Sequence, residues 1–371
     1  MNSVDCEFLV IGGGVIGLSI ARKISSTSPK TILIEKNSFL GEESSSRNSG
    51  VIHAGFYYPL DSLKSKLCNL GNKLLYKYCK DRNIFCKNTK KLLVTKNSED
   101  LELFDRYKKN AESVGGDKLR ILEKSEIKQI EPEIETNYAL LSPESGIFDV
   151  HSYMNSLEKE ILDNGGLISV NTELKSVEIK NNQFFCAVNT KGEDFLLKAK
   201  KIIFCVGLQT EHIGQLFLDE TVKGLKKHRY TKGHYFKLSG PSPFKHLIYP
   251  IPSKFGLGIH SGLDIDGSTR FGPDTFFVED VNYKFERNLH EKFILSIAEY
   301  WPNIKNRNIS EDYVGIRPKI QTENQLFADF EILSEELHGI ENLLILQGIE
   351  SPGLTCSLAL SELIFNSFIN K

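Results

Sequence analysis

Three glycines and one acid form the first pattern with a chemical meaning. Gly12, Gly14 and Gly17 follow the apolar run 8–11, and Glu35 ends a second apolar run at 31–34. In such a turn the first glycine permits a sharp reversal, the second lets backbone N–H groups approach a pyrophosphate, and the third lets a helix pack on a strand. The helix N-terminus adds partial positive charge, and the acid can accept hydrogen bonds from ribose hydroxyls. The pattern predicts a dinucleotide site without a 2′-phosphate; the alternative is a purely structural turn, and the glycines alone do not separate NAD from FAD.

The segments around this turn indicate how it is positioned. Residues 8–34 are typical of a strand, turn, helix and strand, and apolar spacing predicts further helices at 63–78, 101–114, 151–164 and 354–364. Alternating strands are expected at 167–197 and, with Gly and Pro between them, at 231–277, whereas 201–206 and 343–346 are continuous apolar strands typical of a sheet covered on both faces. The expected fold class is α/β: a Rossmann-like domain and an interleaved α+β domain based on an antiparallel sheet. We expect the first domain to contain 1–87, 145–225 and 335–371, and the second to contain 88–144 and 226–334.

Composition excludes several classes of protein. A formal net charge of -2 over 371 residues gives no basic surface for nucleic acid. Seven cysteines without a C-x-x-C pair fit a reducing compartment. Cys68, Cys79 and Cys86 could offer metal thiolates, but they have no histidine at ligand spacing, so small buried side chains are the preferred interpretation and no metal site is predicted. Without an export signal or an apolar run of about 20 residues, we expect a cytoplasmic protein, with any membrane contact peripheral and at the inner face.

Three longer segments carry a family resemblance. Residues 44–55 (SSSRNSGVIHAG), 313–319 (YVGIRPK) and 348–355 (GIESPGLT) resemble, in this order, segments of the L-2-hydroxyglutarate dehydrogenase/oxidase family, within the D-amino-acid oxidase and glycerol-3-phosphate dehydrogenase group of flavoproteins. The resemblance spans nearly the whole chain. It implies FAD as the cofactor, an FAD domain built from discontinuous pieces, and oxidation of a 2-hydroxy acid.

The resemblance also implies which residues contact FAD. The terminal helix would direct its N–H groups at the flavin edge where negative charge accumulates, Gly207 would let a core strand pass close to the cofactor, and the backbone of Leu174 would meet adenine. The expected cofactor-binding residues are Gly12, Gly14, Gly17, Glu35, Lys36, Ser45, Arg47, Asn48, Ser49, Gly50, Leu174, Gly207, Gly348, Ile349, Ser351, Gly353, Leu354 and Thr355.

Oxidation of a 2-hydroxy acid needs a base and a group that holds a carboxylate. His53 is the proposed base, because imidazole titrates near neutrality and this loop is expected beside the flavin; the alternative is a histidine that only donates or accepts a hydrogen bond, and His234 and His260 compete for the role. Arg317 offers a planar fork for a carboxylate. Tyr58 and Lys64 could hold a second carboxylate. His234 and His260 are also expected to contact the substrate, and His234 stands where the family pattern has an acidic or aromatic residue.

The expected reaction is hydride transfer from C2 of a small 2-hydroxy acid, L-2-hydroxyglutarate first, to flavin N5, giving 2-oxoglutarate. The electrons would then leave to a quinone, an electron carrier or oxygen. The alternatives are an amino-acid or sarcosine-type oxidase of the same group, or a flavin-binding electron-relay subunit.

Overall fold

The computed structural model describes residues 3–116, 118–251, 258–322, 325 and 327–370. The chain divides into two compact units, each described by itself: the first contains 1–46, 150–230 and 317–371, and the second contains 47–149 and 231–316. Two of the four boundaries, at 230/231 and 316/317, fall within strands β13 (Arg229–Leu238) and β18 (Ile309–Lys319). Residues 252–257, within the range 231–277 where alternating strands are expected, lie outside the described residues.

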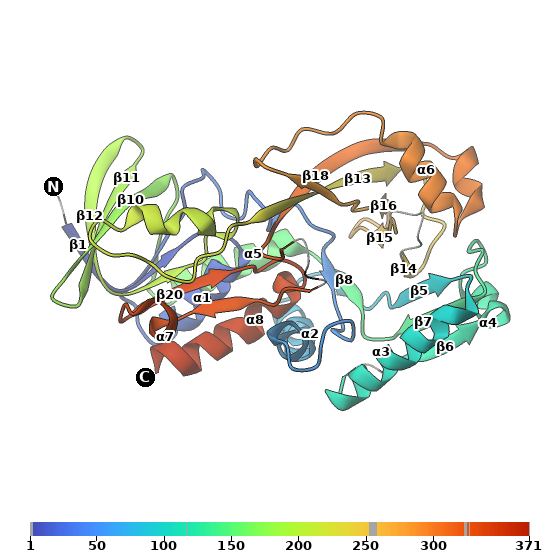
Figure 1. Ribbon diagram of the computed structural model, residues 1–371, viewed down its shortest axis with the longest axis horizontal. Helices are drawn as coiled ribbons and strands as arrows, with labels where there is room; N and C mark the ends of the chain where they lie inside the picture. Colours follow the sequence, from blue (N-terminus) through green and yellow to red (C-terminus); the bar gives the residue numbers. More distant parts are fainter. Residues whose placement is uncertain (1–2, 117, 252–257, 323–324, 326, 371) are drawn as a thin grey trace. The chain divides into compact units, whose positions relative to one another are not determined.

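The core of the first unit is a parallel sheet built from the apolar runs (Figure 1). Its central pairs join Ile11 to Ile34 and to Phe204, Phe204 to Ile345, and Ile34 to Ser169. The strand order is β20-β12-β1-β2-β9. Because the strands are parallel, their carboxyl ends meet at one edge of the sheet, where Gly12, Glu35 and Cys205 follow the strand ends. These strands are β1 (Ser3–Ile11), β2 (Thr31–Ile34), β9 (Leu167–Ser169), β12 (Glu193–Phe204) and β20 (Leu343–Gln347).

An antiparallel extension continues this sheet. β10 (Thr172–Lys180) pairs with β11 (Gln183–Thr190), which pairs with the first half of β12. The two-residue turn between β10 and β11 is Asn181-Asn182, with φ of 51° and 56°; asparagine tolerates this left-handed conformation, which suits a tight hairpin. β19 (Glu331–Leu333) adds an antiparallel strand beside β20.

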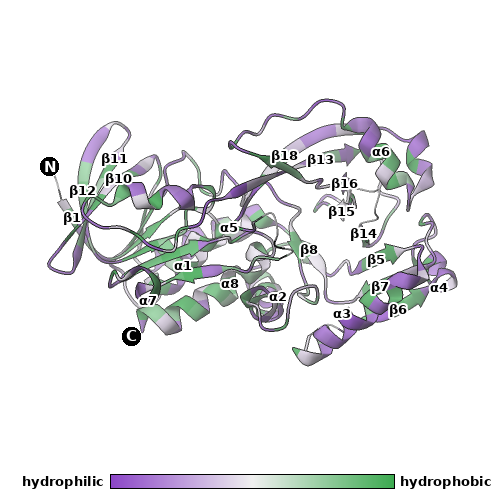
Figure 2. Cartoon of the chain, in the orientation of Figure 1, coloured by the Kyte–Doolittle hydropathy of each residue, from purple (hydrophilic) through white to green (hydrophobic). Residues whose placement is uncertain are grey.

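Helix α1 (Val15–Ser25) packs against both α5 (Val150–Asp163) and α8 (Gly353–Ile364). The Ser19 hydroxyl donates to the Ser357 carbonyl at 3.0 Å, and the Tyr153 hydroxyl lies 2.8 Å from Ser357 Oγ. α8 is mostly hydrophobic in Figure 2, as expected for a helix buried on most sides. The short segments of this unit are η2 (Gly207–Leu216), α7 (Glu335–His338) and η4 (Phe365–Ile369).

The second unit contains a larger, mostly antiparallel sheet, in which β14 and β5 form a parallel pair. Its path is β17-β13-β16-β15-β14-β5-β7-β6, with β18 beside β13. The fold class expected from the sequence is confirmed. Besides β13 and β18 the strands are β5 (Lys91–Thr95), β6 (Arg120–Glu123), β7 (Tyr138–Ser142), β14 (Leu247–Pro250), β15 (Ser261–Leu263), β16 (Thr269–Phe271) and β17 (Phe276–Val278).

Segment 47–87 groups with the second unit, whereas the sequence placed it with the first. Contacts distant in the sequence explain the difference: β3 (Val51–Ile52) pairs with β8 (Gly146–Phe148), which also pairs with β4 (Cys86–Lys87). The Asn72 amide of α2 (Leu63–Asp81) donates to the carbonyls of His53 and Glu144. The remaining elements are η1 (Ser98–Asp100), α3 (Leu101–Ser113), α4 (Lys124–Ile130), α6 (His290–Ala298) and η3 (Pro302–Asn306); α3 is mostly hydrophilic in Figure 2.

Within the described ranges, no helix is both long enough and apolar enough to cross a bilayer. Across the same residues, no group of three His, Cys, Asp or Glu side chains is arranged to hold a metal ion. Cys68 and Cys79 are buried free thiols, and Cys86 is a half-buried one.

Candidate functional site

The glycine turn of the first unit is sterically determined. Gly12 has φ of +105°, and a Cβ there would lie 2.4 Å from the Cys205 carbonyl oxygen. A Cβ on Gly17 would lie 1.9 Å from the Gly12 carbonyl oxygen. Neither position can hold a side chain without moving backbone. At the start of α1, the backbone N–H of Val15 donates to Ser45 Oγ at 3.0 Å, so the loop that contains Ser45 reaches this turn.

Glu35 fastens the end of β2 to the turn. Its Oε2 accepts a hydrogen bond from the Gly13 N–H at 2.7 Å, and its Oε1 accepts one from the Asn37 N–H at 2.8 Å. The side chain is buried, in a residue 8% exposed. A carboxylate accepts through both oxygens and has about four lone-pair sites, so Glu35 keeps acceptor capacity after these two bonds. The bond to Gly13 is a function of Glu35 that the sequence pattern did not indicate.

Other predicted cofactor residues lie at the same edge of this sheet. Gly207, with φ of +49°, follows β12 closely, and Gly348, with φ of +68°, directly follows β20. A Cβ on Gly348 would lie 2.7 Å from the Ile320 side chain. At the start of α8, Gly353 and Thr355 are buried, Ile349 and Leu354 are half-buried, and Ser351 is exposed.

The side chains of two predicted cofactor residues are engaged with other parts of the protein. The Lys36 ammonium forms an ion pair with Glu43 at 2.9 Å. The Leu174 side chain is buried in the core, 7% exposed, at a break in the β10–β11 register. The prediction for Leu174 concerned its backbone, which pairs with Val188 directly before the register break.

These features fit a dinucleotide cofactor. The carboxyl ends of parallel strands and the N-terminus of α1 provide the place where α/β sheets bind such ligands. The backbone packs closely at Gly12 and Gly17, and Glu35, the acid predicted to contact a ribose, is hydrogen-bonded to the same turn. The structure brings Gly12, Gly14, Glu35 and the segments after β12 and β20, which the sequence predicts as cofactor-binding, to this one edge of the sheet.

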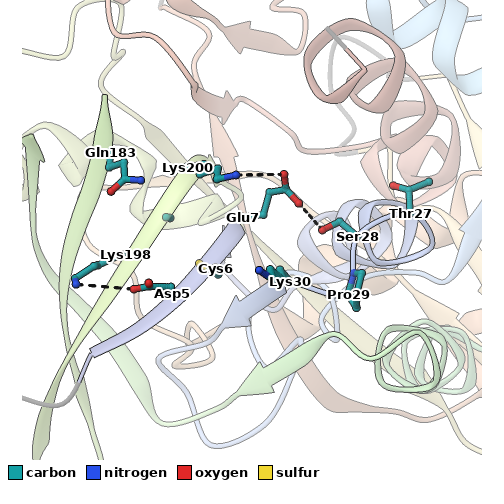
Figure 3. A pocket seen from close by; sticks show the side chains of 11 residues that line it. Asp5, Cys6, Glu7, Thr27, Ser28, Pro29, Lys30, Gln183, Lys198 and Lys200 are labelled. Carbon is teal, nitrogen blue, oxygen red and sulfur yellow. Dashed lines mark hydrogen bonds and ion pairs between the residues drawn. The ribbon is translucent and has the colours of Figure 1, made fainter. Parts of the chain in front are cut away.

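A surface pocket of about 540 Å³ lies elsewhere in the first unit (Figure 3). Its lining includes Asp5, Glu7, Ser28, Lys30 and Lys200, with Glu7 accepting from the Ser28 hydroxyl at 2.8 Å. The lining residues of β1 belong to its amino-terminal half, and Ser28 and Lys30 precede β2. Because α/β sheets bind their cofactors at the carboxyl ends of the strands, this pocket is not the dinucleotide site.

In the second unit, two tyrosines fasten the loop at 47–50. The Tyr313 hydroxyl donates to the Asn48 carbonyl at 2.5 Å, and the Tyr235 hydroxyl lies 3.0 Å from Ser49 Oγ.

Other contacts also hold this loop. The Arg47 guanidinium lies 4.3 Å from the centroid of the Tyr283 ring. Asn48 Oδ1 also accepts from the Gly50 N–H at 2.9 Å, and Gly50 has φ of +60°. These contacts hold the loop 47–50, which carries predicted FAD residues and leads to His53, in a defined conformation.

A cluster of polar and aromatic side chains surrounds His53; we call it the His53 cluster, and it contains His53, Tyr57, Lys91, Tyr249 and His260. Lys91 Nζ lies 3.5 Å from His53 Nδ1 and 4.5 Å from the Tyr249 centroid. The His260 ring stacks on Tyr249 at 3.6 Å and 10°. Burial, then the charge of Lys91, then His260 hold the pKa of His53 well below 6.5, so the imidazole is neutral at neutral pH.

Lys91 and Tyr249 are members of this cluster that sequence reasoning missed. Lys91 is 0% exposed, at the start of a strand whose five residues are all buried. The sequence does place a lysine at the start of an otherwise apolar run, which could have indicated a buried charge. Because Lys90 precedes it, however, the two residues look like ordinary surface lysines. The sequence around Tyr249 does not indicate a functional role, because aromatic residues are common in strands.

His234 lies outside the cluster and makes structural bonds. Its Nδ1 lies 2.9 Å from Asp274 Oδ1, its backbone N–H donates to the same oxygen at 2.7 Å, and its Nε2 accepts from the Glu286 N–H at 3.3 Å. His234 and Asp274 are both 0% exposed. With both ring nitrogens engaged inside the fold, His234 has a structural role and is neither a base nor a substrate contact, contrary to the expectation from sequence.

The remaining predicted substrate residues differ in burial. Lys64 is 3% exposed on α2, whereas its neighbour Lys66 is exposed. Tyr58 is half-buried, with its ring 6.3 Å from that of Tyr57. Arg317 is half-buried on β18 and belongs to the first unit.

Comparison with known proteins now adds to this geometry. The profile of the family described as "FAD dependent oxidoreductase" (DAO) matches residues 7–366. The chain belongs to this family. Its expected cofactor and enzyme class are thereby confirmed: it is an FAD-dependent oxidoreductase.

Individual relatives agree with this assignment. A protein of Arabidopsis thaliana named "L-2-hydroxyglutarate dehydrogenase, mitochondrial" is 37% identical over 98% of this chain and 83% of its own length. One of the same name from Pongo abelii is 29% identical over 96% of this chain and 86% of its own. Among solved structures, the L-alpha-glycerophosphate oxidase of Mycoplasma pneumoniae with FAD bound has a TM-score of 0.85 at 25% identity, covering 97% of this chain and 93% of that one. The resemblance stated from the sequence is confirmed.

Proposed function

We propose that this enzyme oxidises L-2-hydroxyglutarate to 2-oxoglutarate. The observation that carries the proposal is the 37% identity, over nearly the whole chain, to a relative named for that reaction. FAD, when bound, supplies the two-electron acceptor that takes the hydride from C2 of the substrate. A quinone, an electron carrier or oxygen then receives the electrons.

The chain itself must accept the proton of the substrate hydroxyl. His53 and His260 are the candidates, because both are half-buried and His260 acts electrostatically on His53. A neutral imidazole has a nitrogen lone pair for this task. His234 is not a candidate, since both its ring nitrogens have partners inside the fold.

A dicarboxylate also needs groups that hold its two charges. Arg317 offers two parallel N–H donors to one carboxylate. Lys64, with Tyr58, is the candidate for the other, and its burial distinguishes it from the exposed Lys66. Monocarboxylates would lose one of these contacts and react more slowly.

Steady-state kinetics of Arg317→Ala test this assignment. We expect KM for L-2-hydroxyglutarate to rise about 100-fold, since a charged hydrogen-bonded pair contributes about 1.5–3 kcal/mol, while FAD stays bound. Arg287→Ala, which removes an exposed guanidinium, is the control. Unchanged kinetics in Arg317→Ala would remove it from the substrate site, and turnover of glycine, sarcosine or D-amino acids in place of 2-hydroxy acids would replace the proposed function by an amine oxidase.

A further inference from the structure

Lys91 contacts the proposed catalytic histidine without reaching solvent. It is 0% exposed, and its ammonium lies over the Tyr249 ring and over the Tyr57 ring, 4.5 Å and 5.3 Å from their centroids. Aromatic faces attract a cation, more strongly where water is excluded. The two tyrosines thus favour the charged form of Lys91. Because it is fully covered, Lys91 acts on the substrate only through a neighbour.

One such neighbour is His53, and the contact is with its ring nitrogen Nδ1. Lys91 Nζ lies 3.5 Å from His53 Nδ1. An ammonium has three donors and no lone pair, so it bonds Nδ1 only if that nitrogen is unprotonated. A neutral imidazole with an unprotonated Nδ1 carries its hydrogen on Nε2. The position of the His53 backbone is also fixed, since its carbonyl accepts from Asn72 Nδ2 at 2.9 Å.

We propose that Lys91 is a positioning residue that holds His53 in the Nε2–H tautomer, so that His53 donates a hydrogen bond to the substrate and does not accept its proton. The nitrogen that could accept a proton, Nδ1, faces a cation. A positive charge beside an imidazole also disfavours imidazolium, which agrees with the lowered pKa of His53.

His260 is then the proton acceptor. When the hydroxyl O–H bond breaks, its proton joins a ring nitrogen of His260, while the C2–H bond gives its electron pair to the acceptor of the proposed function and the carbonyl forms. His260 stacks on Tyr249, one of the two rings against Lys91, so both imidazoles belong to one cluster. The role of His260 rests on the proposed function, whereas the tautomer of His53 does not.

Nitrogen NMR of the holoenzyme tests the tautomer directly. Histidine labelled with ¹⁵N reports which ring nitrogen carries the hydrogen, and the His53 signals are those lost in His53→Gln. At pH 8 we expect a protonated Nε2 and an unprotonated Nδ1 in the wild type and in Lys90→Met, which changes the exposed neighbouring lysine. Lys91→Met should mix the tautomers and raise the pKa of His53, and Lys91→Arg should restore the wild-type pattern. A protonated Nδ1 in the wild type would overturn the proposal.

Two glutamine variants test the catalytic consequence. His260→Gln should lower kcat by about 100-fold or more and remove the acid limb of the pH profile, as loss of a general base does. His53→Gln keeps an N–H donor and should keep the limb, with a smaller loss. The reverse result would overturn the assignment of His260. Absence of activity with every 2-hydroxy acid would instead refute the proposed function, and the NMR result would still decide the tautomer.

Discussion

The two units prepare their chemistry by different means. In the first, the backbone forms the predicted cofactor turn. Gly12 and Gly17 pack so closely that a Cβ would overlap carbonyl oxygens, and Glu35 accepts a hydrogen bond that links the turn to the end of the next strand. In the second, the His53 cluster is made by side chains of separate strands and loops, with a buried cation at its centre.

Because of this difference, the two regions should tolerate different kinds of substitution. A backbone turn fails when any atom is added, because no rotamer can relieve the clash. A side-chain cluster tolerates changes of shape but depends on charge and on the positions of hydrogens. Substitutions in the glycine turn and at Glu35 should therefore act on FAD content, and those in the His53 cluster on kcat and pH dependence.

The largest effect is expected from Gly17→Ala. The new Cβ would lie 1.9 Å from a carbonyl oxygen, so the turn must move at a cost of about 3 kcal/mol, and the purified protein should lose its flavin absorbance. Gly262→Ala, in the second unit, places its Cβ at an ordinary 3.6 Å and should keep FAD. A yellow Gly17→Ala protein with normal stability would contradict the steric account.

Glu35→Gln should have the next largest effect. The amide group replaces one accepting oxygen by a donor that faces the N–H of Gly13 or Asn37, which costs about 1–3 kcal/mol. We expect FAD to bind about 10–100-fold more weakly in a fluorescence titration. Glu193→Gln, at an exposed position, is the control. Equal affinities in the two variants would show that the carboxylate is dispensable.

Lys64→Met compared with Lys66→Met tests the second unit. The buried Lys64 is proposed to hold a carboxylate, so KM for L-2-hydroxyglutarate should rise about tenfold, or about 1.4 kcal/mol, with FAD content unchanged. Lys66 is exposed, and its variant should be close to wild type. If both variants show the same KM, Lys64 has no part in binding the substrate.

The smallest effect concerns acid stability. Burial lowers the pKa of His338, whose Nδ1 accepts from the Ile340 N–H at 3.1 Å. Below pH 6.5 the histidine of the unfolded chain binds a proton, whereas that of the folded chain stays neutral to a lower pH. The free energy of unfolding therefore decreases as the pH falls below 6.5, by up to about 1.4 kcal/mol per pH unit. Urea unfolding of His338→Gln between pH 7.5 and 5.5 should show a flatter dependence, and His151→Gln, on the exposed side of α5, should match the wild type.

The sequence indicates the first unit well because its site follows local rules. The spacing of Gly12, Gly14 and Gly17 after an apolar strand, and Glu35 after the next, determines where the turn and the acid lie. The apolar runs at 201–206 and 343–346 identify the parallel strands that pair beside it.

The second unit is harder to predict because its contacts join residues far apart in the chain. Lys91 meets Tyr249 through the pairing of β5 with β14, and no local pattern predicts that pairing. His234 shows the converse: a histidine in a strand looks chemically available, yet Asp274, forty residues later, takes its Nδ1.

Anaerobic titration of the purified flavoenzyme with L-2-hydroxyglutarate tests the central claim most directly. We expect one equivalent to bleach the flavin absorbance and to yield one equivalent of 2-oxoglutarate, while the D enantiomer leaves the spectrum unchanged. A flavin that stays oxidised with the L enantiomer and is bleached by another substrate class would contradict it.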